Sequence, residues 1–215
     1  MPQIVPAILE ETKEGFLERI GSVIKLPELS RIQVDFGDGE FIEKKLLPAD
    51  EINPLNPAFE WEAHLMVRQP ADFLDYKIAG FSVIAVHYEA FESKTDIHRA
   101  VKAIRDGGLK PALVINPETK VNALAEFGDV GQFQIMGVHP GRQGQPFLPQ
   151  TLERIRELRK LLPDAIIEVD GGINETNIKQ IAQAGADLIV VGSALVKARD
   201  IKLAYEKLVS ILNSN

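Results

Sequence analysis

The sequence predicts an α/β fold in which a single (β/α)₈ barrel, a TIM barrel, occupies residues 1–215. Short apolar runs rich in β-branched residues recur along the chain, and most are continuous, as in parallel strands covered on both faces. Several segments between these runs carry apolar residues at helical spacing. Eight strand-and-helix units in 215 residues suit a closed barrel, and a doubly wound open sheet is the alternative.

The expected strands are runs of four to seven residues, each dominated by Val, Ile, Leu, Ala or an aromatic residue. A run of this length between turn signals is typical of a buried strand. In chain order, the expected strands are residues 4–9, 32–36, 61–67, 82–87, 112–116, 133–138, 165–169 and 188–191.

The expected helices follow from stripes of apolar residues three or four positions apart, which face a core. Ser93 and Asp96 form a capping box before one stripe, and the pair Gly107 and Gly108 after it indicates the end of that helix. Three prolines between residues 40 and 60 break any helical pattern, so we expect a short or irregular connection there. The stripes cover residues 16–24, 97–104, 152–162 and 201–212.

The composition excludes several classes of protein. The chain has no cysteine, which rules out a disulfide framework, a cysteine-ligated zinc site and thiol catalysis. It has 24 Lys and Arg residues against 31 Asp and Glu residues, a formal net charge of −7, and no basic patch interleaved with aromatic residues, so we expect no nucleic-acid partner. A small anionic ligand stays possible, because backbone N–H groups can hold a phosphate.

Membrane association is not expected either. No apolar run approaches the ~18 residues of a membrane span. Glu10 and Glu11 lie where a signal peptide requires basic and then apolar residues. We therefore expect a soluble, cytoplasmic protein, and its 45% apolar content is enough for one core.

Polar residues at the ends of the expected strands are the candidates for chemistry, because the reacting groups of such barrels lie at the carboxyl ends of the strands. Asp35 ends the second strand, His64 lies within the third, His139 follows the sixth and Asp170 ends the seventh. A single Asp at such a place is commonly a helix cap or a loop hydrogen-bonder. Burial of two carboxylates and an imidazole in one barrel mouth costs several kcal/mol of stability unless these groups pair with each other or hold a cation.

Glycines after the last three strands predict a phosphate site. Glycine allows the backbone to approach a ligand closely and to present its N–H groups. The loops after the seventh and eighth strands are the usual phosphate site of these barrels. The residues concerned are Gly141, Gly144, Gly171, Gly172, Gly192 and Ser193.

Five segments together resemble the ribulose-phosphate 3-epimerase family, in the same order along the chain. The likeness extends from Pro6 to about Val196. The HLMV and VDGG segments, in register with a second strand that contains DG, are specific to that family, whereas GGxN or GSA alone occurs in many phosphate-binding barrels. The segments are VDFGDG (34–39), AHLMV (63–67), VHYEA (86–90), VHPG (138–141, followed by Gly144, Gln145 and Phe147) and VDGGIN (169–174).

The resemblance implies a (β/α)₈ enzyme that inverts C3 of D-ribulose 5-phosphate to give D-xylulose 5-phosphate, or acts on a related ketose phosphate. It implies that Asp35 and Asp170 are the catalytic acid and base, on opposite faces of the substrate. It further implies a divalent metal (zinc, manganese or iron) on Asp35, His64 and Asp170, with Gln33 at the position of a fourth ligand. The resemblance also implies that Met66 and the six phosphate-site residues named above bind the substrate, a small phosphorylated sugar. It is compatible with a homo-oligomer.

The chain departs from the family pattern at several positions. Gln33 replaces a histidine ligand, and an amide oxygen is a poorer zinc ligand than an imidazole. Ala7 replaces a serine that touches the substrate, and Gly37 replaces a methionine. Arg142, in a loop that reads GRQG, is either a phosphate contact or a solvated side chain. His139 is either a replacement ligand or a plain hydrogen-bonding residue.

The two remaining histidines, His87 and His98, are interpreted as structural. Two other functions stay open. A metal-free sugar-phosphate lyase or decarboxylase of this superfamily would carry Asp-x-Lys-x-x-Asp on the second strand, but the segment 35–38 lacks the lysine. A sugar-phosphate-binding barrel without catalysis would explain the departures at Gln33 and Ala7, but not a retained pair of carboxylates, which would only cost stability.

Overall fold

The computed structural model describes residues 2–52, 55–70, 74–141 and 144–214, and within them eight parallel strands close into a barrel. Pairing of the first strand with the last excludes the open-sheet alternative. All predicted strands are confirmed, with ends that differ by at most two residues. The strands are β1 (Gln3–Ile8), β2 (Arg31–Gly37), β3 (Glu60–Met66), β4 (Val83–His87), β5 (Lys110–Ile115), β6 (Gln132–Met136), β7 (Ile166–Asp170) and β8 (Leu188–Val191).

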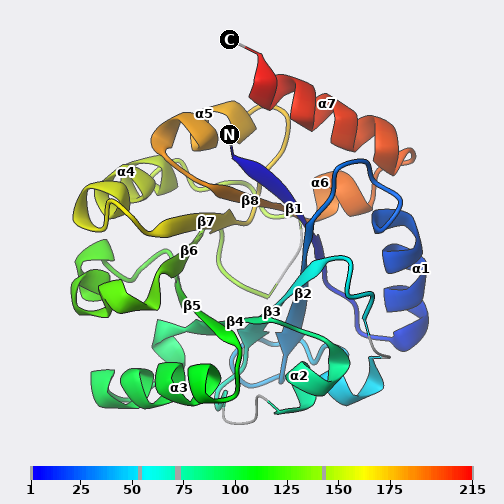
Figure 1. Ribbon diagram of the computed structural model, residues 1–215. Coiled ribbons are helices and arrows are strands. Elements are labelled where there is room, and N and C mark those ends of the chain that lie inside the picture. Colours follow the sequence, from blue (N-terminus) through cyan, green and yellow to red (C-terminus); the bar gives the residue numbers. More distant parts are fainter. Residues whose placement is uncertain (1, 53–54, 71–73, 142–143, 215) are drawn as a thin grey trace.

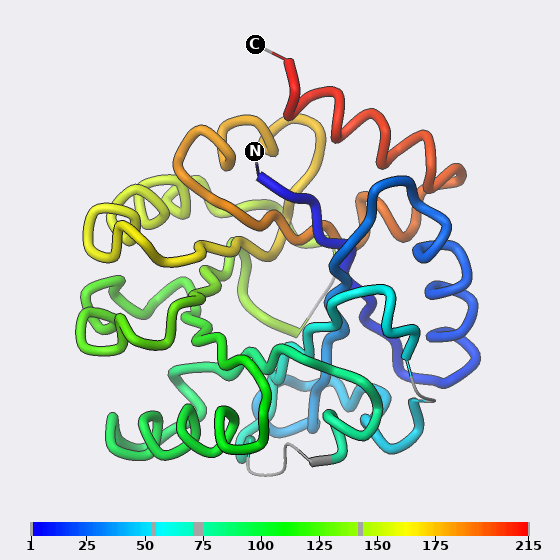
Figure 2. The backbone as a smooth tube through the Cα atoms, in the orientation of Figure 1, coloured from blue at the N-terminus to red at the C-terminus, as the bar shows by residue number. Residues whose placement is uncertain are grey.

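The helices lie outside the ring of strands (Figure 1). The backbone tube shows how the ring closes, with the blue start of the chain beside the orange strand β8 (Figure 2). Helices on the outside of a parallel barrel cover the apolar outward faces of its strands. They are α1 (Lys13–Val23), α2 (Leu74–Ala79), α3 (Lys94–Asp106), α4 (Thr151–Leu161), α5 (Ile178–Ala184), α6 (Ser193–Val196) and α7 (Ile201–Asn213).

Each of the four predicted apolar stripes lies on a helix: α1, α3, α4 and α7. Ser93 caps the start of α3, as predicted: its Oγ accepts from the backbone N–H of Asp96 and donates to the Asp96 carboxylate at 2.6 Å. Gly107 caps the other end of α3, and Gly108 follows in a left-handed conformation with φ 76°. This conformation is one that glycine adopts without steric cost.

The strand-then-helix pattern is incomplete in two units. Among the described residues between β2 and β3, the one helix is the 3₁₀ helix η1 (Ala49–Glu51), and the prolines between residues 40 and 60 led us to expect such an irregular connection. After β5 it forms the 3₁₀ helix η3 (Val121–Val130), which is kinked at Phe127, and a third 3₁₀ helix, η2 (Tyr88–Ala90), follows β4. An α-helix is therefore not needed in every unit to cover the barrel.

Two kinds of core result from this arrangement. Large apolar side chains such as Trp61, Ile104, Phe133 and Leu158 fill the space between the strands and the helices. Inside the barrel, β1, β4, β5 and β8 contribute mainly aliphatic residues. The other strands contribute buried polar residues: Arg31, Gln33, Asp35, Glu62, His64, Gln132, Gln134, Glu168 and Asp170.

The polar interior follows from strand geometry, because alternate residues of a strand point to the same face. In β2, Arg31, Gln33 and Asp35 lie two positions apart and all point inward. As for membranes, no helix in the described ranges combines the length and the apolar character needed to cross a bilayer.

Candidate active site

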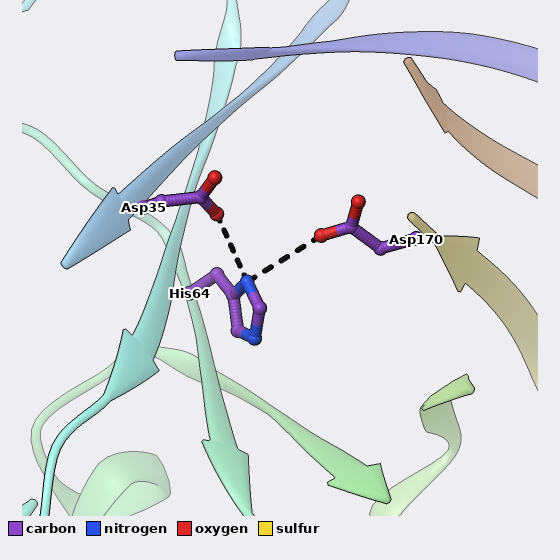
Figure 3. A group of neighbouring side chains, drawn as sticks. All are labelled: Asp35, His64 and Asp170. Atoms are coloured by element: carbon purple, nitrogen blue, oxygen red, sulfur yellow. Dashed lines mark hydrogen bonds and ion pairs between the residues drawn. The ribbon is translucent and has the colours of Figure 1, made fainter. Parts of the chain in front are cut away.

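Asp35, His64 and Asp170 meet inside the barrel, at the carboxyl ends of β2, β3 and β7. Asp35 lies directly opposite His64 in the pairing of β2 with β3, and Asp170 lies opposite Met136 in the pairing of β7 with β6. Figure 3 shows both carboxylates reaching toward the imidazole ring from separate strands. His64 Nδ1 is 2.9 Å from Asp35 Oδ1 and 3.5 Å from Asp170 Oδ2. The structure thus brings together three of the four strand-end residues that the sequence selected, without His139.

Gln33 occupies the centre of this group. Its side chain is fully buried, and Nε2 donates to Asp35 Oδ1 at 2.8 Å and to Asp170 Oδ2 at 2.9 Å. The same nitrogen lies 3.4 Å from His64 Nδ1. A neutral amide therefore bridges two carboxylates whose negative charges repel each other.

Burial makes Asp170 a titratable group near neutral pH. Loss of hydration, followed by the negative charge of Asp35, raises the pKa of the Asp170 carboxyl to about 7, although the charge of His64 and the Gln33 hydrogen bond oppose this. For His64, burial lowers the pKa, but the hydrogen bond to Asp35 and the charges of Asp35 and Asp170 outweigh burial, and the net pKa is raised. Such shifts are typical of groups that transfer protons.

A second histidine orients the first. His64 Nε2 and His87 Nε2 are 2.9 Å apart, and His87 Nδ1 lies 3.5 Å from the carboxylate of Glu89. Burial, together with the nearby charge of His64, lowers the pKa of His87 to about 4, so its ring is neutral at neutral pH. A neutral His87 ring can accept a hydrogen bond from His64 Nε2–H, and this holds the ring with Nδ1 toward the carboxylates of Asp35 and Asp170. His87 is thus buried, as a structural residue is, but it also contacts the site.

One cavity at the barrel mouth includes the three clustered residues, Met66 and every residue of the predicted phosphate site. The sequence reasoning did not select several other lining residues, which lie at the end of a strand or in the loop that follows one. That position is the signal that could have identified them. They are Leu9, Met136, Val138, Pro140, Gln145 and Ile173.

The phosphate-site loops approach each other closely. Gly172 has φ 70°, and a Cβ atom built there would lie 2.5 Å from the backbone nitrogen of Phe147, so no other residue fits without movement of the chain. A Cβ at Gly144 would lie 4.0 Å from Ser193 Oγ. The loops after β6, β7 and β8 therefore line one edge of the cavity with backbone.

The departures from the family pattern have distinct surroundings. Ala7 lines the cavity, where the resemblance places a serine. Gly37 packs against Ile42, and a Cβ at Gly37 would lie 2.5 Å from Ile42 Cδ1, so Ile42 fills the space that a side chain at position 37 would need. Ile42 also packs beside Met66 at the cavity edge.

The remaining candidates lie away from the cluster. His139 is 61% exposed and pairs with Glu118 at 3.0 Å, and the metal-binding group found among the described residues is Asp35, His64 and Asp170, without His139. His139 is therefore a hydrogen-bonding rim residue, which excludes the replacement-ligand interpretation in this arrangement. Arg142 lies outside the described residues. His98 is exposed on α3, with its ring centroid 4.7 Å from that of Phe127.

The cluster has donors suited to a divalent metal. One ligand atom from each of Asp35, His64 and Asp170 can be chosen such that all lie within 4.8 Å of one another. Carboxylate oxygens and imidazole nitrogens are ligands of zinc, manganese and iron. The three donors face the same cavity as the glycine loops, so a cation there would lie beside a bound ligand.

Comparison with known proteins identifies the family. Residues 3–196 match the family described as the ribulose-phosphate 3 epimerase family. The ribulose-phosphate 3-epimerase of Bacillus subtilis (strain 168) is 31% identical over 217 residues, covering 97% of this chain and 98% of that protein. The ribulose-phosphate 3-epimerase of Aquifex aeolicus (strain VF5) is 37% identical over 159 residues, covering 71% of this chain and 70% of that protein.

Solved structures agree on the fold. A 3-hexulose-6-phosphate synthase aligns with a TM-score of 0.73 and 20% identity, over 98% of this chain and 99% of that chain. KGPDC from Streptococcus mutans aligns with a TM-score of 0.74 and 14% identity, over 99% and 97% of the two chains. Identities this low support a shared fold alone. The family match rests on the sequence itself and covers residues 3–196. The chain belongs to the ribulose-phosphate 3-epimerase family.

Proposed function

We propose that this protein inverts C3 of D-ribulose 5-phosphate, or of a closely related ketose phosphate, through proton transfer by Asp35 and Asp170. The observation that supports this most strongly is the position of the two carboxylates. They extend from strands on different sides of one cavity and approach a shared imidazole (Figure 3). Inversion at carbon requires one group that removes a proton from one face and another that delivers a proton to the opposite face.

The two carboxyl groups are suited to opposite roles. Mutual repulsion of their charges favours a state in which the pair holds one proton, and the pKa of Asp170, raised to about 7 by burial and by Asp35, fits that state. In such a state one group is ready to accept the C3 proton while the other is ready to donate. The roles then reverse for the return reaction.

The removed proton is weakly acidic, so the negative charge left on the sugar oxygens needs stabilisation. Asp35, His64 and Asp170 would hold a divalent cation, which when bound supplies Lewis-acid stabilisation of that charge. His87 holds the His64 ring so that Nδ1 faces the carboxylates. The backbone at Gly144, Gly171, Gly172, Gly192 and Ser193 would bind the phosphate and so place C3 between the two aspartates.

The proposal is tested with D-ribulose 5-phosphate in an assay that couples formation of D-xylulose 5-phosphate to a second enzyme. We expect turnover by the purified protein, supplied in turn with Zn²⁺, Mn²⁺ or Fe²⁺, and a much lower rate with unphosphorylated D-ribulose. A folded sample that shows no turnover under any of these conditions would overturn the choice of substrate. Ligand titration would then distinguish a binding barrel from a different enzyme. Cytoplasmic location and homo-oligomer formation remain predictions.

A further inference from the structure

The side-chain amide of Gln33 contacts all three donor atoms of the candidate cation site. Gln33 Nε2 and the three donor atoms, Asp35 Oδ1, His64 Nδ1 and Asp170 Oδ2, form a small tetrahedron. Five of its six edges are 2.8 to 3.5 Å long. The amide nitrogen is thus at the fourth corner, opposite the face formed by Asp35, His64 and Asp170. Within the described part of the chain, the amide oxygen Gln33 Oε1 is buried and has no hydrogen-bond partner.

The side of the amide that faces the donors decides what the site can hold. In this arrangement two N–H hydrogens point at the two carboxylates, which suits a site without a cation. A cation would repel those hydrogens and would attract the lone pairs of the amide oxygen. Rotation about the Cγ–Cδ bond of Gln33 exchanges Nε2 and Oε1 in nearly the same volume, and Oε1 has no partner to lose.

We propose that Gln33 Oε1 rotates inward to become the fourth ligand of a divalent cation, and that this shifts the preference of the site from zinc toward manganese and magnesium. The proposal deepens the proposed function, since it concerns the same cation site. Three oxygen donors and one nitrogen form a harder ligand set than two imidazoles and two carboxylates. Carboxylate and carbonyl oxygens suit Mg²⁺ and Mn²⁺, whereas imidazole suits Zn²⁺.

The rotation also weakens binding of any cation, because it breaks the two hydrogen bonds from Gln33 to Asp35 and Asp170. Two signatures follow. Overall affinity is lower than in a protein with histidine at position 33, and the ratio of zinc affinity to manganese affinity is smaller.

The test measures dissociation constants of Zn²⁺ and Mn²⁺ for the metal-stripped protein and for Gln33→His, by competition with a chelator and without substrate. We expect Gln33→His to tighten zinc binding by about tenfold or more, an effect as large as those of outer-shell partners, and to change manganese binding much less. Equal changes for both ions, or no gain for zinc, would overturn the proposal.

Gln134→His is the matched control. Gln134 is also a buried glutamine, but its Nε2 reaches only one of the three donors, Asp170 Oδ2, at 3.3 Å. Histidine at position 134 should therefore leave the zinc-to-manganese ratio unchanged. A similar rise in both variants would mean that added imidazole in the barrel, and not the fourth corner, determines the preference.

A measurement on the unmodified protein covers the case in which Gln33→His fails to fold. The side-chain amide signals of Gln33, assigned with Gln33→Leu, are followed by NMR as diamagnetic Mg²⁺ is added. We expect both N–H signals to shift, because the two N–H groups leave the carboxylates. Mg²⁺ binding that moves His64 signals but not those of Gln33, or no Mg²⁺ binding at all, would contradict the rotation. Both measurements omit substrate, so they stand apart from the outcome of the epimerase assay.

Discussion

The two ends of the barrel interior carry similar residues with different surroundings. At the amino ends of β2, β3 and β7 lie Arg31, Glu62 and Glu168, which we call the lower layer. Asp35, His64 and Asp170 lie further along the same three strands and form the upper layer. Each layer combines two carboxyl groups with one basic group.

The lower layer is neutralised by the protein itself. Arg31 pairs with Glu62 through two guanidinium nitrogens and donates to Gln132 at 2.9 Å. Gln132 in turn donates to Glu62 at 3.1 Å and to Glu168 at 2.8 Å. Burial, and then the charge of Glu62, holds the pKa of Glu168 well above its usual range, which favours a neutral side chain.

The upper layer is bridged by a neutral amide, that of Gln33, and its basic member is an imidazole. Its carboxyl groups also line a cavity, whereas Glu62 and Glu168 are fully buried. The comparison teaches that residue type alone does not make a site. In the lower layer, the Arg31 guanidinium already neutralises the carboxylate of Glu62, and the pair contributes to the fold. In the upper layer, the carboxyl groups of Asp35 and Asp170 face a cavity and are available to a ligand.

The largest effect is expected in the upper layer. Asp35→Asn and Asp170→Asn each remove a group that transfers a proton, and we expect kcat to fall by about 10²- to 10⁴-fold. Melting temperatures should not fall, because an amide relieves the repulsion between the carboxylates. The measurements are steady-state kinetics and thermal unfolding. Near-normal rates in either variant would remove that residue from the mechanism.

The matching change in the lower layer should affect stability. Arg31→Met leaves Glu62 buried without its cation, and we expect the free energy of unfolding to fall by about 3–5 kcal/mol. Urea unfolding measures this, with Lys102→Met as the control. Lys102 forms an exposed ion pair with Asp106, so its loss should cost about 1 kcal/mol or less. Equal losses in the two variants would contradict the distinction between the layers.

His87 should show a smaller effect on the upper layer. His87→Phe keeps a ring in the same space but removes the partner of His64 Nε2, and we expect metal affinity to fall by about 10- to 100-fold. His98→Gln, on the exposed face of α3, is the control and should change neither the metal affinity nor the tautomer of His64. The tautomer of His64, read from ¹⁵N NMR, should become mixed in His87→Phe. An unchanged tautomer would make His87 a packing residue.

Asp170 should also make the stability of the protein depend on pH. Its pKa in the folded, metal-free protein is about 7, against 3.8 in the unfolded chain, so the folded state holds the proton more tightly. The resulting stabilisation is complete below pH 3.8 and is lost as the pH rises through about 7. Urea unfolding from pH 4.5 to 8 should show stability falling in the unmodified protein relative to Asp170→Asn. Parallel curves would mean that Asp170 is ionised throughout.

Much of this fold was predictable because its signals are local. Eight mostly continuous apolar runs give the strands, and polar residues at or near the carboxyl ends of these strands give Asp35, His64 and Asp170. The sequence also indicated an irregular connection after β2, because proline excludes an α-helix there.

The rest depends on contacts between distant strands. The 3₁₀ helix after β5 carried no distinct local signal. The approach of His87 to His64, and of His139 to Glu118, depends on which side chains neighbouring loops and strands bring together. The Gln33 bridge was visible only as a substitution, because its two partners lie on β2 and on the distant strand β7.

Hydrogen exchange at C3 tests the two-carboxylate account most directly. In D₂O, the unmodified protein should convert D-ribulose 5-phosphate into product that carries deuterium at C3, since the incoming proton comes from a second group in exchange with solvent. Asp35→Asn and Asp170→Asn should each retain slow C3 exchange with one epimer only, and with opposite epimers. Product without deuterium at C3, or exchange of the same epimer by both variants, would contradict the assignment of Asp35 and Asp170 to opposite faces.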